Sequence, residues 1–385
     1  MNTKELDQTY VAGTYKRFDA ALKYGKGSTI YDEDGKEYID FGSGIAVNAF
    51  GISDDEWKQA IICQLDKIQH TSNLYYNENG AKLAEMLCTK TGMKKVFFSN
   101  SGAEANECAI KTARKFGTDI NPEKNVIITL ENSFHGRTIT TLSATGQEVF
   151  HKNFTPFTEG FIHIPANDIQ ALEAAISDKV AAIMIETVQG EGGVNVLSQE
   201  FLAAIEKITT ENDILLVVDE VQTGNGRCGA LYSYMKLGIT PDIVSTAKGL
   251  AGGLPMGATL LGERVIDTLT AGSHGSTFGA NPVCAAAAIS IINRLDDAFF
   301  KDVDQKSEYI KAQLEEISGV KSVSGMGLMM GVEVEKSAAD IANECLKKGL
   351  LVLTAKTKVR LLPALNITKE EIDKGLSILR EVIEA

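Results

Sequence analysis

Ile214-Leu215-Leu216-Val217-Val218-Asp219, residues 214–219, is the stretch that most strongly indicates the fold: five consecutive apolar residues that end in a carboxylate. An apolar run without polar alternation is typical of a strand buried on both faces of a parallel sheet. Runs of the same kind recur between helical stretches, at residues 96–98, 126–130, 180–185, 243–244 and 258–261. This alternation predicts an α/β fold, with a mostly parallel sheet flanked by helices.

A helix is expected directly after the first of these runs. Ser101 is followed three residues later by Glu104, the form of a capping box in which each side chain accepts a backbone N–H group. Residues 105–116 then carry apolar side chains at three-and-four spacing, as an amphipathic helix does. We therefore place a helix N-terminus at Ser101.

The pattern changes after about Ala280 and indicates a second, smaller α+β domain. A long Ala-rich helix is followed by short strands near residues 325–333, 350–353 and 359–362, and by a final helix from about Thr368. A hairpin turn at residues 32–35 suggests an N-terminal arm that packs on this domain. We predict a large domain over residues 46–275 and a small domain formed by residues 1–45 and 276–385.

Composition narrows the class of partner. The chain has 385 residues, is 44% apolar and carries a net charge of -13, with no cluster of Lys and Arg. This balance disfavours nucleic-acid and membrane partners, and the polar start of the chain resembles no export signal, so a cytoplasmic location is expected. The six cysteines and five histidines show no ligand spacing, so we predict no metal site and structural cysteines.

One glycine motif favours a different class of enzyme. Residues 224–229 fit the Gly-x-Gly-x-x-Gly pattern of dinucleotide-binding proteins. That fingerprint needs glycines directly at the end of a strand and a long helix after them, whereas residues 219–223 intervene here and Pro241 shortens any following helix. We interpret the stretch as a Gly-rich surface turn and keep a nicotinamide-dependent oxidoreductase as a distant alternative.

Chemically useful residues follow several strand ends, where open parallel sheets bind their ligands. Ser101, Gly102 and Ala103 offer backbone N–H groups at a helix N-terminus, which suit a phosphate dianion. Phe134 offers an aromatic face for stacking, and Arg137 offers a guanidinium for a carboxylate. Taken singly, a capped helix, a buried Phe and a surface Arg explain these residues equally well.

Two further strand ends complete the pattern. Asp219 ends a fully apolar strand, and a buried acid there needs a partner such as a protonated pyridine nitrogen. Lys248 follows the apolar strand that begins at Ile243, a placement that favours a lowered pKa and a nucleophilic amine. A phosphate cradle, an aromatic plate, a buried acid and a strand-end lysine together suit pyridoxal 5'-phosphate.

With these residues in place, the chain resembles the class III aminotransferases of pyridoxal-phosphate fold type I over nearly its whole length. The motifs that carry the resemblance occur in one order along the chain: residues 99–105, 134–138, 189–193, 219–224, 245–249 and 274–279. The resemblance implies that Lys248 carries the cofactor covalently and that Asp219 pairs with its ring nitrogen, so these two are the expected catalytic residues. The residues expected to bind the cofactor are Ser101, Gly102, Ala103, Phe134, Asp219, Glu220, Val221, Gln222, Lys248 and Thr277.

The same resemblance implies how substrates bind. Arg137 and Arg360 are expected to bind carboxylates, and Glu191 to act as a switch that pairs with Arg360 until 2-oxoglutarate arrives. Ser276 and Thr277 are expected to enter the site of the partner subunit, which implies a homodimer with shared active sites. The expected substrates are a small-molecule amino donor and 2-oxoglutarate.

The donor itself is less tightly specified. The short chain and residues 134–137 and 43–48 favour N2-acetylornithine, while ornithine, succinylornithine, an N-acetylated lysine precursor and 4-aminobutyrate stay open. A departure from the family pattern at residues 51–55 lies close to the segment expected to line the pocket. A catalytically silent scaffold that keeps the fold is a third possibility.

Overall fold

Seven strands form the central sheet of the computed structural model, which describes residues 1–385. Their order across the sheet is β4 (Lys95–Ser99), β12 (Gly257–Leu261), β11 (Ile243–Thr246), β10 (Leu215–Asp219), β7 (Val180–Ile185), β5 (Val126–Leu130) and β6 (Phe161–Ile164). Only β12 runs antiparallel to its neighbours. The predicted mostly parallel α/β sheet is therefore confirmed, and each predicted strand lies within two residues of its expected bounds.

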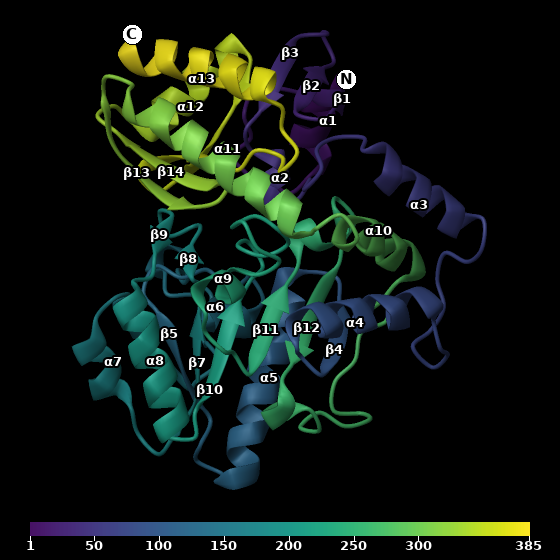
Figure 1. Ribbon diagram of the computed structural model, residues 1–385, viewed down its shortest axis with the longest axis vertical. Coiled ribbons are helices and arrows are strands. Elements are labelled where there is room, and N and C mark those ends of the chain that lie inside the picture. The colour runs from purple at the N-terminus through teal and green to yellow at the C-terminus, as the bar shows by residue number, and fades with distance from the viewer.

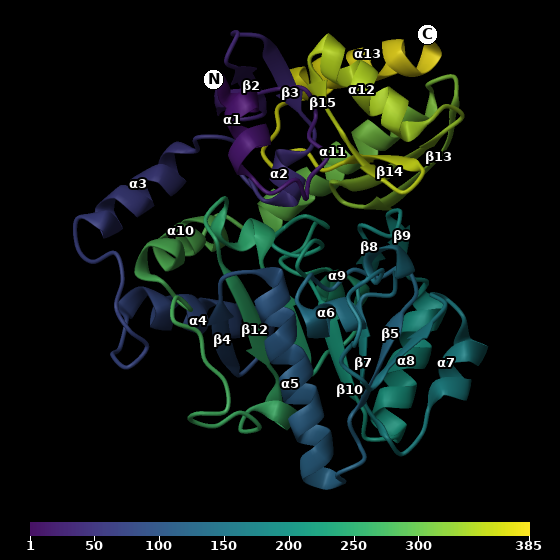
Figure 2. The same cartoon turned by 180° about the vertical axis from the view of Figure 1, so that it is seen from behind.

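Apolar residues on both faces of the central strands explain why these runs lack alternation. On β7, Ile183 and Ile185 belong to the large core that includes helix α8 (Gln199–Glu211), whereas Ala182 and Met184 face the core that includes α5 (Gly102–Ile120). Figures 1 and 2 show these two helices on opposite sides of the sheet. Burial from both sides removes any need for a polar face.

The two ends of the chain meet in the upper lobe of Figure 1, where the purple N-terminal segment lies beside the yellow C-terminal helix. Strand β3 (Glu37–Asp40) pairs in parallel with β15 (Leu350–Leu351), and β2 (Thr29–Asp32) pairs with β3 as the predicted hairpin. The Asp32 carboxylate accepts N–H groups within the turn. The hairpin thus packs on the C-terminal segment, as expected.

A second small sheet, with the order β13-β14-β17-β16, completes this lobe. The strand expected over residues 350–353 is divided, because β15 joins one sheet and β16 (Leu353–Ala355) joins the other. The last helix, α13 (Lys369–Glu384), begins after Thr368, as predicted, and Thr368 and Glu371 form a capping box there. Helix α10 (Pro282–Ile292) packs instead against α3 (Asp55–Leu65) and α4 (Glu78–Thr91), beside the central sheet.

The remaining elements connect these parts. The remaining helices are α1 (Thr3–Tyr10), α2 (Ser43–Ala46), α6 (Ile139–Ala144), η1 (Glu148–Phe150), α7 (Ile169–Ala175), α9 (Ser233–Leu237), η2 (Lys248–Ala251), η3 (Glu263–Val265), α11 (Asp297–Glu315) and α12 (Ala338–Lys348). The remaining strands are β1 (Leu22–Lys26), β8 (Val188–Gln189), β9 (Asn195–Val196), β13 (Val320–Met326), β14 (Met329–Val334) and β17 (Lys358–Leu361). None of the helices has the length and apolar character required to cross a bilayer.

The expectation of a surface turn at residues 224–229 is wrong. Residues 222–228 are all buried. The Arg227 guanidinium donates to the carbonyl oxygens of Leu328, at 3.0 Å, and Pro363, at 2.5 Å, so the segment is fastened to the C-terminal part of the chain. The rejection of a dinucleotide fingerprint stands, because the next helix, α9, has only five residues.

Candidate active site

The N-terminus of α5 presents free backbone donors at the carboxyl edge of the sheet. Ser101 Oγ accepts the N–H of Glu104 at 3.2 Å, which satisfies one donor of the first turn. The Glu104 carboxylate accepts from Asn100 N rather than from Ser101 N, so only half of the predicted capping box forms. The N–H groups of Gly102 and Ala103 have no acceptor within the helix, which leaves them available to an anion.

Glycine at position 102 allows the next loop to approach closely. A Cβ atom on Gly102 would lie 2.7 Å from Cγ1 of Val221, nearer than side-chain atoms pack. Val221 therefore lies directly over the start of α5, two residues after the end of β10. This contact joins the expected phosphate cradle to the loop that carries Asp219.

Asp219 is 3% exposed and lies in a network of donors. Its carboxylate accepts from Asn106 Nδ2 at 2.7 Å and from Val221 N at 3.0 Å, and it contacts His135 Nδ1 at 2.8 Å. Burial lowers the pKa of His135, but the contact with Asp219 outweighs burial and the pKa is raised. The Asp219 carboxylate is thus fixed by three contacts at the carboxyl edge of the sheet.

Lys248 lies two residues after the end of β11, the strand next to β10, and its backbone is strained. Its φ of 41° lies in the left-handed region, which non-glycine residues seldom adopt. Burial lowers the pKa of its ammonium group, Arg360 acts in the same direction, and Glu191 and Asp219 oppose the shift without cancelling it. A larger share of the neutral amine, which is the nucleophilic form, follows from this lowered pKa.

The predicted residues meet in one cavity of about 410 Å³. Lys248 and Asp219 both line it, so the two expected catalytic residues face one cavity. The other predicted residues on its wall are Ser101, Gly102, Ala103, Phe134, Arg137, Val221 and Gln222.

Glu191 and Arg360 form an ion pair next to this cavity. Arg360 Nη1 lies 2.6 Å from Glu191 Oε1, and Nη2 lies 3.3 Å from Oε2. Burial alone would raise the pKa of Glu191, but the Arg360 guanidinium outweighs burial and the pKa is lowered. Gln222, which lines the cavity, hydrogen-bonds both partners at 3.4 and 3.2 Å. Glu191 and Arg360 are thus in contact, and the role of Glu191 as a switch stays a prediction.

Four further predicted residues are not enclosed in the cavity: Arg137 lines it from an exposed position, and Glu220, Ser276 and Thr277 do not line it. Arg137 is exposed and stacks on the ring of Phe150, with its guanidinium carbon 4.0 Å from the ring centroid. Glu220 points away from the cavity, because its carboxylate accepts from Thr223, Ser233 and Tyr234. Ser276 and Thr277 do not line this chain's cavity.

Sequence reasoning missed three residues of the network: Asn106, His135 and Glu186. His135 lay within a quoted motif but received no role. Glu186 had the same signal as Asp219, because both acids directly follow an apolar strand, β7 and β10 respectively. Asn106 has no local signal, because its contact with Asp219 arises only on folding.

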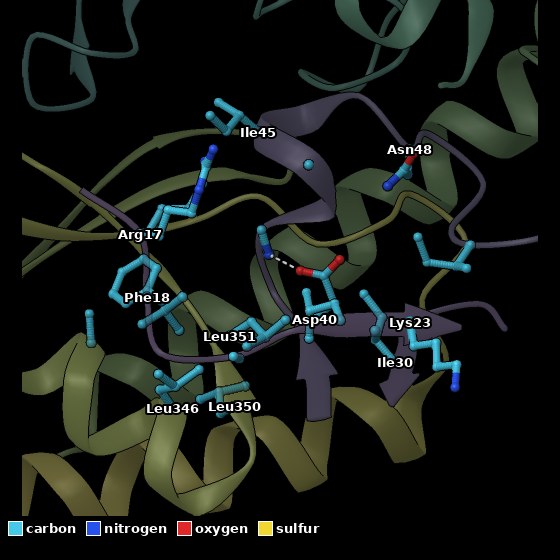
Figure 3. A pocket seen from close by; sticks show the side chains of 18 of the residues that line it. Arg17, Phe18, Lys23, Ile30, Asp40, Ile45, Asn48, Leu346, Leu350 and Leu351 are labelled. Carbon is cyan, nitrogen blue, oxygen red and sulfur yellow. Dashed lines mark hydrogen bonds between the residues drawn. The ribbon is translucent and has the colours of Figure 1, made fainter. Parts of the chain in front are cut away.

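A second cavity, of about 560 Å³, lies under the N-terminal segment. Figure 3 shows Phe18 and Leu346 on one side and Ile30 on the other, with Asp40 between them. Most of its wall is apolar. It does not contain Lys248, but it shares the turn at residues 42–48 with the first cavity, whose wall includes Val47.

Comparison with known proteins agrees with this geometry. The family described as aminotransferase class III matches residues 10–383. The acetylornithine aminotransferase of Haemophilus ducreyi is 50% identical over 384 residues, which cover 99% of this chain and 98% of the relative. The chain therefore belongs to the class III aminotransferases and is a pyridoxal-phosphate-dependent transaminase.

Two solved structures show how far the similarity extends in three dimensions. Ornithine aminotransferase from Toxoplasma gondii matches with a TM-score of 0.94 at 31% identity and covers 100% of this chain and 95% of its own. N-acetylornithine aminotransferase from Stenotrophomonas maltophilia matches with a TM-score of 0.85 at 35% identity, over 98% of each chain. The distant alternative of a nicotinamide-dependent oxidoreductase is thereby overturned.

The residues present fit pyridoxal 5'-phosphate. The free N–H groups at the start of α5 suit its phosphate, and the Asp219 carboxylate suits a protonated ring nitrogen. The Lys248 amine suits its aldehyde, and the Phe134 ring suits its flat face. All four groups line the same cavity.

Proposed function

We propose that the protein transfers the terminal amino group of N2-acetylornithine to 2-oxoglutarate, giving N-acetylglutamate 5-semialdehyde and glutamate in arginine biosynthesis. The observation that carries the catalytic part is the shared cavity of Lys248 and Asp219. The choice of donor is supported by the name and the 50% identity of the Haemophilus ducreyi relative. We also propose that the protein is cytoplasmic. We propose a large domain over residues 46–275 and a small domain formed by residues 1–45 and 276–385.

Each residue has a distinct task in this proposal. When bound, pyridoxal phosphate supplies an aldehyde that bonds to amines and a ring that accepts electrons from the broken carbon–hydrogen bond. Asp219 keeps a proton on the ring nitrogen, and Ser101, Gly102 and Ala103 hold the phosphate. Lys248 Nζ takes the proton from the substrate carbon and returns it.

Phe134 and Val221 would hold the bound ring between them, and Gln222 would contact its polar edge. Both side chains and Gln222 line the cavity, whereas Glu220 contributes through its backbone and through the fold of its loop. The loops after β5 and β10 therefore orient the ring without covalent contact. Correct orientation matters because the carbon–hydrogen bond must lie perpendicular to the ring for its electrons to be accepted.

Two arginines orient the substrates. Arg137 lies at the mouth of the cavity and binds the carboxylate of the donor. Arg360 stays paired with Glu191 while the donor reacts, because the donor brings no second carboxylate to that place. When 2-oxoglutarate enters, its second carboxylate displaces Glu191 from Arg360.

We also propose a homodimer in which Ser276 and Thr277 enter the site of the other subunit. Large apolar side chains support this proposal, since Leu74 is 88%, Tyr75 71% and Phe278 57% exposed. Exposed apolar groups of this size are typical of protein interfaces. The two segments that carry them are close in space, because Asn73 Nδ2 donates to the carbonyl oxygens of Ser276 and Gly279 at 2.9 and 3.1 Å. Light scattering coupled to gel filtration is expected to give twice the chain mass.

The donor is tested with purified holoenzyme and 2-oxoglutarate. The panel comprises N2-acetylornithine, ornithine, succinylornithine, an N-acetylated lysine precursor and 4-aminobutyrate. N2-acetylornithine is expected to give the highest kcat/KM. A higher kcat/KM for any other member would replace the proposed donor, and no turnover with any member would refute the proposed function.

A further inference from the structure

Glu186 is a second buried acid at the carboxyl edge of the sheet. It directly follows β7, as Asp219 ends the neighbouring β10, and the register Ile185 to Val218 brings the two acids side by side. Its exposure is 5%, and it lines the same cavity as Lys248. Nothing in the proposed chemistry uses this carboxyl group.

The carboxyl group of Glu186 joins two loops that carry functional residues. Oε1 accepts the N–H of Phe134 at 2.8 Å, and Oε2 accepts the N–H of Gly190 at 3.4 Å. Phe134 provides the stacking ring, and Gly190 precedes Glu191, the partner of Arg360. One side chain thus spans the cavity between the cofactor-stacking loop and the switch loop.

We propose that Glu186 is a positioning residue whose negative charge holds Phe134 and Gly190 in place around the bound cofactor. This inference rests on the proposed site but not on the proposed donor. The charged form has two accepting oxygens, one for each loop. Protonation converts one oxygen into a donor, so the weaker contact with Gly190 is released and a favourable charge near the ring is lost.

The surroundings place this change of charge in the neutral range. Burial raises the pKa of Glu186, the nearby His135 lowers it, and the Asp219 carboxylate raises it further, so that the pKa reaches about 7. The two N–H groups lower the pKa, and Lys248 also faces the carboxyl group. Raising the pH through this range therefore ionises Glu186 and strengthens its hold on both loops.

The test measures the dissociation constant of pyridoxal phosphate for wild type and Glu186→Gln. Glutamine keeps one accepting oxygen for Phe134 N, but it has no charge at any pH. At about pH 8.5 the variant is expected to bind the cofactor roughly tenfold more weakly, the loss of one charge-assisted hydrogen bond. At about pH 6 both side chains are neutral, so the two dissociation constants are expected to converge.

Asp242→Asn is the control, because Asp242 is a half-buried acid whose pKa is raised by burial and which accepts a backbone N–H, that of Leu216, at the opposite end of the sheet. The cofactor affinity of Asp242→Asn is expected to equal that of wild type at both pH values. The proposal would be overturned if the dissociation constant of Glu186→Gln, divided by that of wild type, were the same at both pH values. It would also be overturned if the variant bound the cofactor as tightly as wild type at both pH values.

Folding of each variant is checked by circular dichroism. Should Glu186→Gln fail to fold, Glu186→Asp replaces it: the shorter side chain keeps the charge but cannot span both loops. Weaker cofactor binding than wild type at alkaline pH is expected, and equal binding would overturn the proposal. None of these measurements depends on the amino donor, so failure of the proposed substrate and failure of the Glu186 proposal are distinguishable.

Discussion

Replacing Glu191 by Gln tests the proposed switch most directly. Glu191 and Arg360 are paired in the structure, and in the proposed mechanism 2-oxoglutarate reaches Arg360 only after the Glu191 carboxylate leaves it. Glutamine keeps the size of the side chain and one oxygen that accepts from Arg360, but it removes the negative charge. We therefore expect Glu191→Gln to bind 2-oxoglutarate more tightly than wild type does.

The geometry sets the size of the effect. Two guanidinium nitrogens of Arg360 meet two oxygens of Glu191, and the exposure of the side chains is 4% and 27%. A partly buried, charge-assisted contact of this kind contributes about 2 kcal/mol, more than an exposed pair. If the neutral amide keeps roughly half of it, displacement becomes easier by about 1 kcal/mol, which corresponds to an affinity about fivefold higher.

The assay is a steady-state measurement of KM for 2-oxoglutarate and for the amino donor. KM for 2-oxoglutarate is expected to fall about fivefold, while KM for the donor stays the same or rises, since Arg360 is no longer neutralised during the donor half-reaction. Glu200→Gln, on the exposed surface of α8, provides the baseline. Unchanged or higher KM for 2-oxoglutarate in Glu191→Gln would refute the switch.

Three further substitutions test the site and the fold. Lys248→Ala is expected to abolish turnover while circular dichroism stays native, and full activity would contradict the role of the lysine. Gly102→Ala places a Cβ atom 2.7 Å from Val221, so a loss of cofactor affinity of roughly tenfold or more is expected in a fluorescence titration, and wild-type affinity would show that the cradle lies elsewhere. Arg227→Ala leaves the carbonyl groups of Leu328 and Pro363 without their donor, so denaturant unfolding of the protein is expected to show a loss of about 3 kcal/mol, and a change below about 0.5 kcal/mol would contradict the burial argument.

Much of the sheet is predictable because its signal is local. A run such as Val180–Ile185 is apolar on both faces, so its own residues reveal a buried strand. The edge strand β6, Phe161–Ile164, was not expected, because it is half exposed and contains a histidine. Local pattern identifies continuous apolar runs, which include the edge strand β4, and loses a strand such as β6 whose exposed and buried residues are mixed.

Burial of a turn is a different kind of property. The glycines at residues 224–229 correctly predict a turn, but whether it faces water depends on what packs over it. Here the carbonyl groups that cover Arg227 lie more than 100 residues away in sequence. An arginine surrounded by glycines gives no local sign that it is buried, so the predicted surface turn was wrong.

The site shows the same division. Asp219 and Lys248 were predictable because the carboxyl ends of neighbouring parallel strands meet at one edge. Glu186 was equally predictable by that rule, since it also follows an apolar strand. Asn106 was not, because its amide reaches Asp219 across a helix–sheet contact that no spacing in the sequence encodes.

The backbone of the turn at Ser43–Ala46, beside the expected substrate pocket, could not be predicted from the sequence. Four consecutive residues have positive φ values, between 41° and 66°, and three of them are not glycine. A left-handed turn costs roughly 1–2 kcal/mol for each such residue, so propensity alone would never predict it. It persists because buried contacts hold its entrance: Asp40 accepts the N–H groups of Gly42 and Ser43, and the Ser43 hydroxyl donates to Leu362 O at 2.6 Å.

That strained turn is the wall shared by the two cavities, and it directs Val47 toward the cofactor and Ile45 toward the N-terminal segment. Strain of this size persists only where the surrounding structure over-determines the backbone, which is typical of functional sites. In the proposed choice of donor, residues 43–48 therefore act through an imposed backbone shape as well as through their side chains. For this reason the residue types at positions 43–48 favour N2-acetylornithine as the donor, and the measured kcat/KM values for the donor panel test that choice.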